Sequence, residues 1–220
     1  MHKALPIQLV TFDLDGTMLD DEWAHGEANR QIGRRLGIDY SQMSGMTGYS
    51  VRGKWEILCR QAGCGADIEE IAREHFRLTL EIVREAKVPE SPGLTETLQQ
   101  LRSAGYRIAV TSSSDESFVR AILDYLQVGR YLDFLLSKDQ VRELKPSPEI
   151  YLTALRTAGV TARQAVGVED SEPGCLALRR AGIYSIGFLN EGANHQNLEA
   201  ADTKIQRMQD LLPLLEQMQA

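Results

Sequence analysis

The sequence contains few of the features that mark membrane-spanning, disulfide-rich or nucleic-acid-binding proteins. None of its apolar runs approaches the roughly 18 residues that a membrane span requires. Cys59, Cys64 and Cys175 are too few and too irregularly spaced for a disulfide framework or a zinc site, so free thiols in a reducing compartment are expected. The formal net charge of −7 argues against non-specific binding to nucleic acid or to an anionic membrane surface.

The N-terminal residues also lack the pattern of a targeting signal, because Pro6 and Gln8 interrupt their apolar character and acidic residues follow at once. A cytoplasmic location is therefore expected. Hydrophobic residues make up 43% of the 220-residue chain and charged residues 25%, which is the composition of an ordinary globular protein. A chain of this length can bury a sizeable core, as one domain or as one domain carrying an insertion.

Strand and helix patterns alternate over most of the chain. A strand is predicted at residues 7–12, and further strands at 106–111, 134–136, 165–168, 183–188 and 203–205. Helices are predicted at 93–104, 116–126, 148–158, 174–181 and 208–217. This alternation predicts an α/β fold, a doubly wound Rossmann-like parallel sheet with helices on both faces.

One region breaks the alternation. Between the first strand and residue 90 the pattern is helical and polar, with predicted helices at 22–36, 50–61 and 68–86 and no convincing strand. We therefore expect an all-helical cap domain, residues 20–89, inserted into a catalytic core formed by residues 1–19 and 90–220. Pro89 and Pro92 favour a rigid, non-helical crossing at the second boundary.

The first strand ends in two aspartates, Asp13 and Asp15, that are followed by Gly16. Alternate residues of an extended chain share a face, so the two carboxylates point the same way and repel each other. A hard divalent cation such as Mg²⁺ would cancel that repulsion, because it requires oxygen ligands. Gly16 lets the backbone turn sharply at this point.

Polar groups of complementary type follow the later strands. Ser112 and Ser113 end the second strand, Lys145 lies in a loop after the third, and Glu169 and Asp170 end the fourth. Ligands of parallel sheets bind beyond the carboxyl ends of the strands, so these groups are expected to converge at one edge. Acids, a hydroxyl and a lysine at that edge would form a metal and phosphate site.

Four motifs, in this order, resemble those of the haloacid dehalogenase superfamily of phosphotransferases. They are Asp13-Leu14-Asp15-Gly16-Thr17, Thr111-Ser112-Ser113, Lys145-Pro146 and Glu169-Asp170-Ser171. The resemblance covers nearly the whole chain, and its details are similar to the branch of β-phosphoglucomutases and small sugar-phosphate phosphatases. Other members of the superfamily, the dehalogenases and transport ATPases, lack an acid at the position of Asp15, so phosphate transfer is the implied reaction.

The resemblance implies a role for each strand-end residue. Asp13 would be the nucleophile that becomes an aspartyl phosphate, and Asp15 the general acid and base. Mg²⁺ would be held by the Asp13 carboxylate, the Asp15 backbone carbonyl and Asp170, with Glu169 acting directly or through water.

The remaining core residues would act on the phosphoryl group itself. By the same resemblance, Ser112 would hydrogen-bond a phosphoryl oxygen with help from the Ser113 backbone amide. Lys145 would offset the negative charge between Asp13 and the phosphoryl group. Each residue also has an ordinary alternative: a serine in a turn, a surface lysine, or acids that cap the next helix.

The cap is expected to select the substrate, a small phosphorylated metabolite and in particular a sugar phosphate. His25 occupies the place of a cap histidine that assists proton transfer in the β-phosphoglucomutase branch, although an exposed histidine needs no role. Residues 47–52 resemble the cap loop that contacts the sugar, and Arg52 could clamp an anion. His75 is expected at the surface.

A phosphatase is favoured over a sugar phosphomutase, which is the alternative. The mutases use a lysine in the last cap helix, and alignment by eye places Ala72 near that position. Family members with caps of this type are often monomers, so a monomer is expected.

Overall fold

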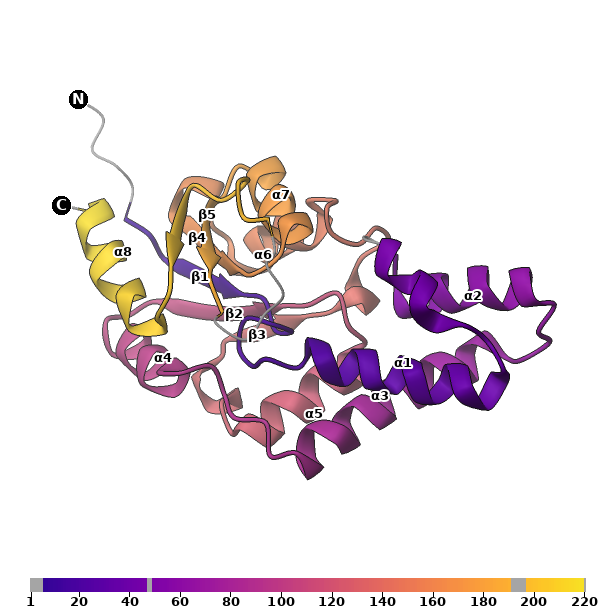
Figure 1. Cartoon of the computed structure of the whole chain (residues 1–220). Coiled ribbons are helices and arrows are strands. Elements are labelled where there is room, and N and C mark those ends of the chain that lie inside the picture. The colour runs from indigo at the N-terminus through magenta and orange to yellow at the C-terminus, as the bar shows by residue number, and fades with distance from the viewer. Residues whose placement is uncertain (1–5, 47–48, 191–196, 220) are drawn as a thin grey trace. The chain divides into compact units, whose positions relative to one another are not determined.

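The structure is a computed structural model that describes residues 6–46, 49–190 and 197–219 (Figure 1). The chain divides into two compact units. One comprises Met1–Asp20 and Pro89–Ala220, which we call the core unit, and the other comprises Asp21–Val88, which we call the helical unit.

The core unit is built on a six-stranded, all-parallel sheet with the strand order β3-β2-β1-β4-β5-β6. The strands are β1 (Leu9–Phe12), β2 (Arg107–Thr111), β3 (Phe134–Leu136), β4 (Ala165–Glu169), β5 (Tyr184–Phe188) and β6 (Thr203–Ile205). Every residue of β1 and β4 is buried, because helices cover both faces of the sheet. The strand that delivers the paired aspartates thus lies inside the sheet, between β2 and β4.

Helices flank this sheet on both sides. They are α4 (Leu94–Ser103), α5 (Glu116–Leu126), α6 (Glu149–Ala158), α7 (Glu172–Ala181) and α8 (Leu211–Gln219). In Figure 1, α6 and α7 lie together on one side of the strands, and α4 packs with α8 on the other. The apolar side chains of α6 and α7 form one core cluster with those of the inner strands, among them Tyr151, Leu178 and Leu9. The predicted α/β, doubly wound class is confirmed.

Small differences from the predicted element boundaries have local causes. The helix predicted to begin at Gly174 begins at Glu172, because the Ser171 hydroxyl caps it by accepting a hydrogen bond from the Gly174 amide at 3.1 Å. The helix predicted over 208–217 begins as a 3₁₀ turn, Met208–Asp210, and continues as α8. Short 3₁₀ turns also occupy connections that carry no clear periodicity, at Tyr40–Gly45, Gly129–Tyr131, Lys138–Gln140 and Ala162–Gln164.

The helical unit contains α1 (Glu22–Leu36), α2 (Val51–Ala62) and α3 (Ile68–Glu85). α3 packs against both other helices, and a small apolar core that includes Trp55, Ile32 and Ile71 holds the three together. The Ser50 hydroxyl accepts from the Gly53 amide at 3.0 Å and so places Ser50 just outside α2.

The chain leaves and re-enters the core unit at two neighbouring points. Leu19 and Glu90 form an antiparallel β-bridge, and the Ser91 amide donates to the Met18 carbonyl at 2.8 Å. The Ser91 hydroxyl donates to the Thr17 carbonyl at 2.7 Å. Backbone pairing within the core unit therefore holds both ends of the inserted segment side by side.

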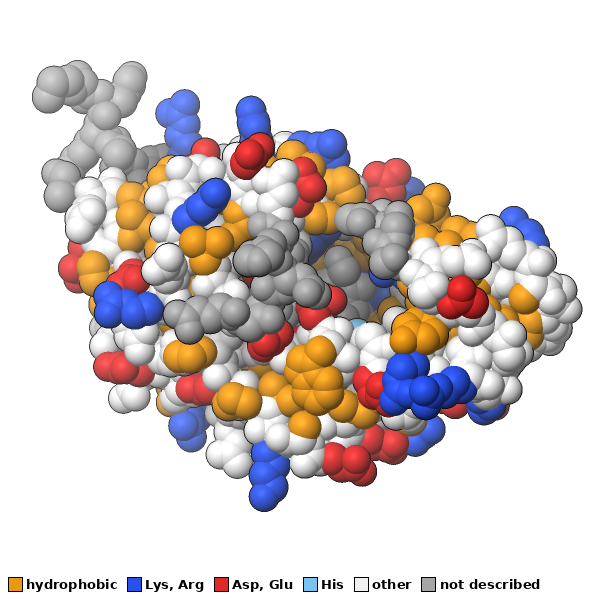
Figure 2. Space-filling view, viewed as in Figure 1, with side chains coloured by type: hydrophobic (Ala, Val, Ile, Leu, Met, Phe, Trp, Pro, Cys, Tyr) orange, Lys and Arg blue, Asp and Glu red, His pale blue; other side chains and the backbone are white. Residues whose placement is uncertain are grey.

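Charged side chains of both signs are scattered over the face drawn in Figure 2 and form no extended field of one sign. Within the described residues, no helix combines the length and the apolar character needed to cross a membrane.

Candidate active site

The register of the three central strands places the predicted site residues beside one another. Phe12 of β1 pairs with Val110 of β2 and with Val168 of β4, so the next residues along the three strands reach the same edge of the sheet. The Asp13 amide continues the ladder by donating to the Val168 carbonyl at 3.0 Å. Residues that are more than 90 positions apart in sequence therefore meet at the carboxyl ends of these strands.

Lys145 connects the ends of all three strands. Its Nζ donates to Asp13 Oδ1 at 2.5 Å, to the Thr111 carbonyl at 2.8 Å and to Glu169 Oε1 at 2.6 Å. Burial alone would lower the pKa of Lys145, but the carboxylates of Asp13 and Glu169 raise it well above its ordinary value. The side chain is thus a buried ammonium ion directed at Asp13, and not a surface lysine.

Three buried carboxylates lie together here, and two of them, Asp13 and Glu169, contact the ammonium. Oxygen atoms of Asp13, Glu169 and Asp170 all lie within 4.8 Å of one another. Burial, followed by repulsion from Glu169, raises the pKa of Asp13 well above its usual value, and Lys145 only partly opposes this. A set of hard oxygen ligands with an excess of two negative charges fits a divalent cation of the magnesium type. The arrangement is an acidic cluster that could hold a metal ion.

Two glycines allow the acids to approach so closely. A Cβ atom on Gly16, whose φ is +81°, would lie 2.2 Å from Asp170 Oδ2, and one on Gly174 would lie 1.9 Å from the Glu169 carboxyl carbon. Neither position can accept a side chain without displacing a carboxylate. The Asp170 carboxylate is also fixed by the Thr17 hydroxyl, which donates to Oδ1 at 3.1 Å.

Serine hydroxyls orient Asp15. Ser114 Oγ donates to Asp15 Oδ2 at 2.7 Å, whereas the contact from the predicted Ser112 Oγ is longer, at 3.4 Å. Ser112 also accepts from the Ser114 amide at 3.0 Å, and Ser113 is partly exposed beside them. The Asp15 carboxylate is not a member of the three-acid cluster with Asp13, so the structure separates the two aspartates into different surroundings.

Sequence reasoning missed Ser114 and also Tyr151, whose hydroxyl donates to Glu169 Oε1 at 2.6 Å. The serine could have been found from the run Ser112-Ser113-Ser114, in which alternate residues share a face. The tyrosine gave no such signal, because an aromatic residue on the apolar stripe of a helix is typical of core packing.

In the helical unit, His25 lies against a second histidine. His25 Nδ1 is 2.9 Å from His75 Nε2, and His25 Nε2 is 3.7 Å from Asp21 Oδ2. His75 is fully buried, so its expected surface location is wrong. The apolar stripe of α3, which includes Ile71 and Phe76, carries His75 into the interior and could have indicated its burial.

Arg52, the other predicted substrate contact, forms an ion pair with Glu69 inside the helical unit, and both side chains are about half exposed. Residues 47 and 48 of the predicted contact segment lie outside the described residues. α3 contains no lysine, and Ala72 is buried in it.

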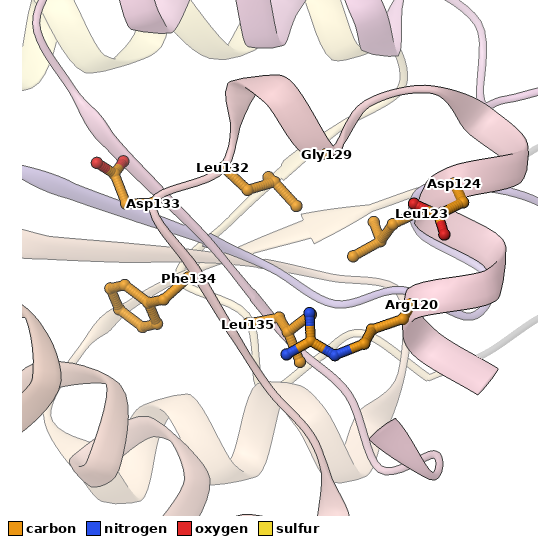
Figure 3. A pocket seen from close by; sticks show the side chains of 8 residues that line it. All are labelled: Arg120, Leu123, Asp124, Gly129, Leu132, Asp133, Phe134 and Leu135. Carbon is orange, nitrogen blue, oxygen red and sulfur yellow. The ribbon is translucent and has the colours of Figure 1, made fainter. Parts of the chain in front are cut away.

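A separate pocket of about 430 Å³ opens at the edge of the sheet, between α5 and β3 (Figure 3). Two of its three charged lining residues have protein partners: Arg120 pairs with Glu116 at 2.6 Å, and Asp133 with Arg102 at 2.8 Å. Asp124, Gly129 and apolar side chains such as Leu132 and Phe134 complete its lining. It contains none of the strand-end residues and does not resemble a phosphate site.

Comparisons with known proteins find similar sequences and structures. The family model described as haloacid dehalogenase-like hydrolase matches residues 7–182. A phosphoglycolate phosphatase of Pseudomonas putida is 29% identical over 94% of this chain and 78% of its own. The validoxylamine A 7′-phosphate phosphatase of Streptomyces hygroscopicus subsp. limoneus is 30% identical over 82% of this chain and 85% of its own.

Among solved structures, CbbY from Rhodobacter sphaeroides matches with a TM-score of 0.82 and 25% identity, over 93% of this chain and 96% of its own. That protein has been solved in complex with phosphate and, as a variant, with xylulose 1,5-bisphosphate.

Proposed function

This chain belongs to the haloacid dehalogenase-like hydrolases, and we propose that within that family it is a Mg²⁺-dependent phosphatase of small phosphorylated metabolites. The observation that carries the proposal is the buried ammonium of Lys145, held between the carboxylates of Asp13 and Glu169 at the edge of the sheet. Such an arrangement neutralises charge on a nucleophilic carboxylate while a second anion approaches it.

The acidic cluster of Asp13, Glu169 and Asp170 would hold the cation. When bound, Mg²⁺ supplies the positive charge that balances the cluster and draws electron density from the phosphoryl oxygens. The resemblance adds the backbone carbonyl of Asp15 to this set. Buried oxygen ligands in close proximity support the assignment, since soft metals prefer sulfur or nitrogen.

The chemistry then divides between the two aspartates. The Asp13 carboxylate attacks phosphorus, the bond from phosphorus to the leaving oxygen breaks, and an aspartyl phosphate forms. Asp15, oriented by Ser114 and Ser112, gives its proton to the leaving oxygen. It then takes a proton from a water molecule, whose oxygen attacks phosphorus and releases inorganic phosphate from Asp13.

The substrate is proposed to be a sugar phosphate or a phosphorylated polyol. This proposal is supported by the relative named for validoxylamine A 7′-phosphate and by the sugar bisphosphate bound to the CbbY variant. The relatives named for phosphoglycolate, a phosphorylated hydroxy acid, support only the wider class of small phosphorylated metabolites. Selection of that substrate is proposed for the helical unit, with His25 and Arg52 as contacts. The three cysteines are free thiols, which accords with the proposed cytoplasmic location.

A direct test compares the wild-type protein with the variant Asp13→Asn on a panel of phosphate esters. Wild-type protein with Mg²⁺ should release inorganic phosphate from some of the esters, and Asp13→Asn should abolish release while its circular dichroism spectrum stays unchanged. Activity retained in Asp13→Asn would refute the mechanism. A hexose 1-phosphate that yields its 6-phosphate isomer in place of free phosphate would identify the alternative, a sugar phosphomutase. The absence of lysine from α3 favours the phosphatase.

A further inference from the structure

Tyr151 on α6 is among the largest fully buried side chains of the protein, and it is not part of the mechanism described above. Its ring belongs to the apolar cluster between α6, α7 and the sheet, a role that phenylalanine would fill equally well. Its hydroxyl, however, leaves that cluster and donates to Glu169 Oε1 at 2.6 Å. The polar atom therefore requires an explanation beyond packing.

The oxygen that accepts this hydrogen bond is the same one that binds Lys145. Glu169 Oε1 lies 2.6 Å from Lys145 Nζ, and Ser171 Oγ donates to the other carboxylate oxygen, Oε2, at 2.9 Å. Tyr151 and the Lys145 ammonium thus donate to the same oxygen, and the hydrogen bond from Tyr151 stabilises part of the negative charge of Glu169. Lys145 retains a full interaction with Asp13 because Glu169 is already hydrogen-bonded by a neutral group.

The direction of this hydrogen bond follows from the groups themselves, because a phenol hydroxyl carries a proton to donate and an ionised carboxylate only accepts. The ring adds a second contact, since Lys145 Nζ lies 5.2 Å from its centroid. Replacing Tyr151 with phenylalanine keeps the ring and removes only the hydrogen bond.

We propose that Tyr151 is a positioning residue for the phosphatase reaction, which directs the Lys145 ammonium toward Asp13 by sharing Glu169 Oε1 with it. The inference rests on the proposed function. Without the hydroxyl, Glu169 attracts Lys145 more strongly, and less positive charge remains where Asp13 and the phosphoryl group meet. Because Tyr151 is fully buried and contacts Glu169 and Lys145, the loss should appear in kcat and not in KM.

The test compares Tyr151→Phe with Tyr106→Phe, using p-nitrophenyl phosphate as the substrate. Tyr106 is a matched control, because it is also buried and its hydroxyl accepts from Gln219 Nε2 at 2.7 Å, outside the candidate active site. We expect kcat to fall about 10- to 100-fold in Tyr151→Phe, as for one lost hydrogen bond to a charged group, with KM changed less than about twofold. Tyr106→Phe should keep both values. Equal effects in the two variants, or a change confined to KM, would overturn the inference.

A double-mutant cycle with Glu169→Gln identifies the path of the effect. If Tyr151 acts through Glu169, then Tyr151→Phe should lower kcat by less than about twofold in the Glu169→Gln background. If the two substitutions instead lower kcat by independent factors that multiply in the double variant, Tyr151 does not act through Glu169. The same four proteins can be compared by thermal unfolding without substrate, which shows whether the Tyr151 hydroxyl and the Glu169 carboxylate are energetically coupled. Additive Tm shifts in the double variant would overturn the inference. A wild-type protein that is inactive on every ester would instead refute the proposed function.

Discussion

Replacing Lys145 with methionine would remove a buried ammonium ion and leave its partners in place. The Lys145 side chain is 5% exposed and forms ion pairs of 2.5 Å with Asp13 and 2.6 Å with Glu169. Methionine retains most of the apolar stem, so the change isolates the charge. Without a metal ion, the three carboxylates of Asp13, Glu169 and Asp170 would then face one another with no cation between them.

The expected loss of stability is large. Two unit charges at 2.6 Å attract each other by about 6 kcal/mol at an effective dielectric constant near 20. The desolvation of the lysine offsets much of this attraction, and removal of one partner of a buried pair costs about 3–5 kcal/mol in unfolding free energy. For a domain of this size that corresponds to a decrease in Tm of roughly 6–20 °C.

The pH dependence follows from the signs of the two pKa shifts. Interactions with Asp13 and Glu169 raise the pKa of Lys145 above 10.5, so the stabilisation is fully present below pH 10.5 and is lost only as the pH rises through the raised value. The full penalty of Lys145→Met is therefore expected at pH 7.5. Burial and Glu169 already raise the pKa of Asp13, and loss of Lys145 removes the influence that lowers it. Protonation of Asp13 in mild acid should then reduce the penalty near pH 5.

The assay is urea unfolding of the metal-free protein at pH 7.5 and at pH 5, compared with Lys138→Met. Lys138 pairs with Asp115 at 2.5 Å, but both side chains are more exposed, at 16% and 24%. The control should lose at most about 1 kcal/mol. Equal losses in the two variants, or a Lys145→Met penalty that does not shrink at pH 5, would refute the electrostatic account.

Further changes test the rest of the site and the core. Gly174→Ala should displace the Glu169 carboxylate, which lies 1.9 Å from the new Cβ, and lower stability by about 1–3 kcal/mol and kcat at least about tenfold. Ser114→Ala should lower kcat about tenfold with KM unchanged, because the hydroxyl orients Asp15. Burial raises the pKa of Cys175 to about 12, so at pH 8 this thiol should react with a disulfide reagent only after unfolding.

Matched controls accompany these variants. Gly129→Ala places a Cβ where no atom lies within 4 Å and should leave stability and kcat unchanged. Ser103→Ala removes an exposed hydroxyl that donates to the Gln99 carbonyl at 2.9 Å and should not alter kcat. If either control behaves like its counterpart at the site, steric or polar contact with the acids is not the cause. Rapid labelling of native Cys175 would show that its burial is transient.

Much of the core unit could be predicted because the hydrophobic periodicity of its segments and the turn residues between them indicate the same strands and helices. The apolar run before Asp13 is a strand buried on both faces, and parallel strands end at one edge, so the grouping of Asp13, Lys145 and Glu169 follows from the order of elements. The roles proposed for these residues come from the family resemblance and not from the order of elements. Nothing in the spacing indicated that Lys145 would bind both acids at once.

Residues that act through their orientation could not be recognised in this way. A tyrosine such as Tyr151 on an apolar stripe carries the same pattern whether or not its hydroxyl reaches a carboxylate. The surface location predicted for His75 was wrong. Histidine is a polar residue type that suggests the surface, but His75 lies on α3 at the helical spacing of the buried residues. Residue type and helical position gave opposite answers there, and position was correct.

The bridge between Leu19 and Glu90 has a consequence for how the protein can change. The two ends of the inserted segment are held beside each other within the core unit, and the entropic cost of closing a loop between such ends grows only slowly with its length. Because core-unit residues alone form the register of β1 with its neighbours, we expect insertions or deletions within Asp21–Val88 to leave that register unchanged. The helical unit and the strand register of the core unit can therefore change separately within one continuous chain.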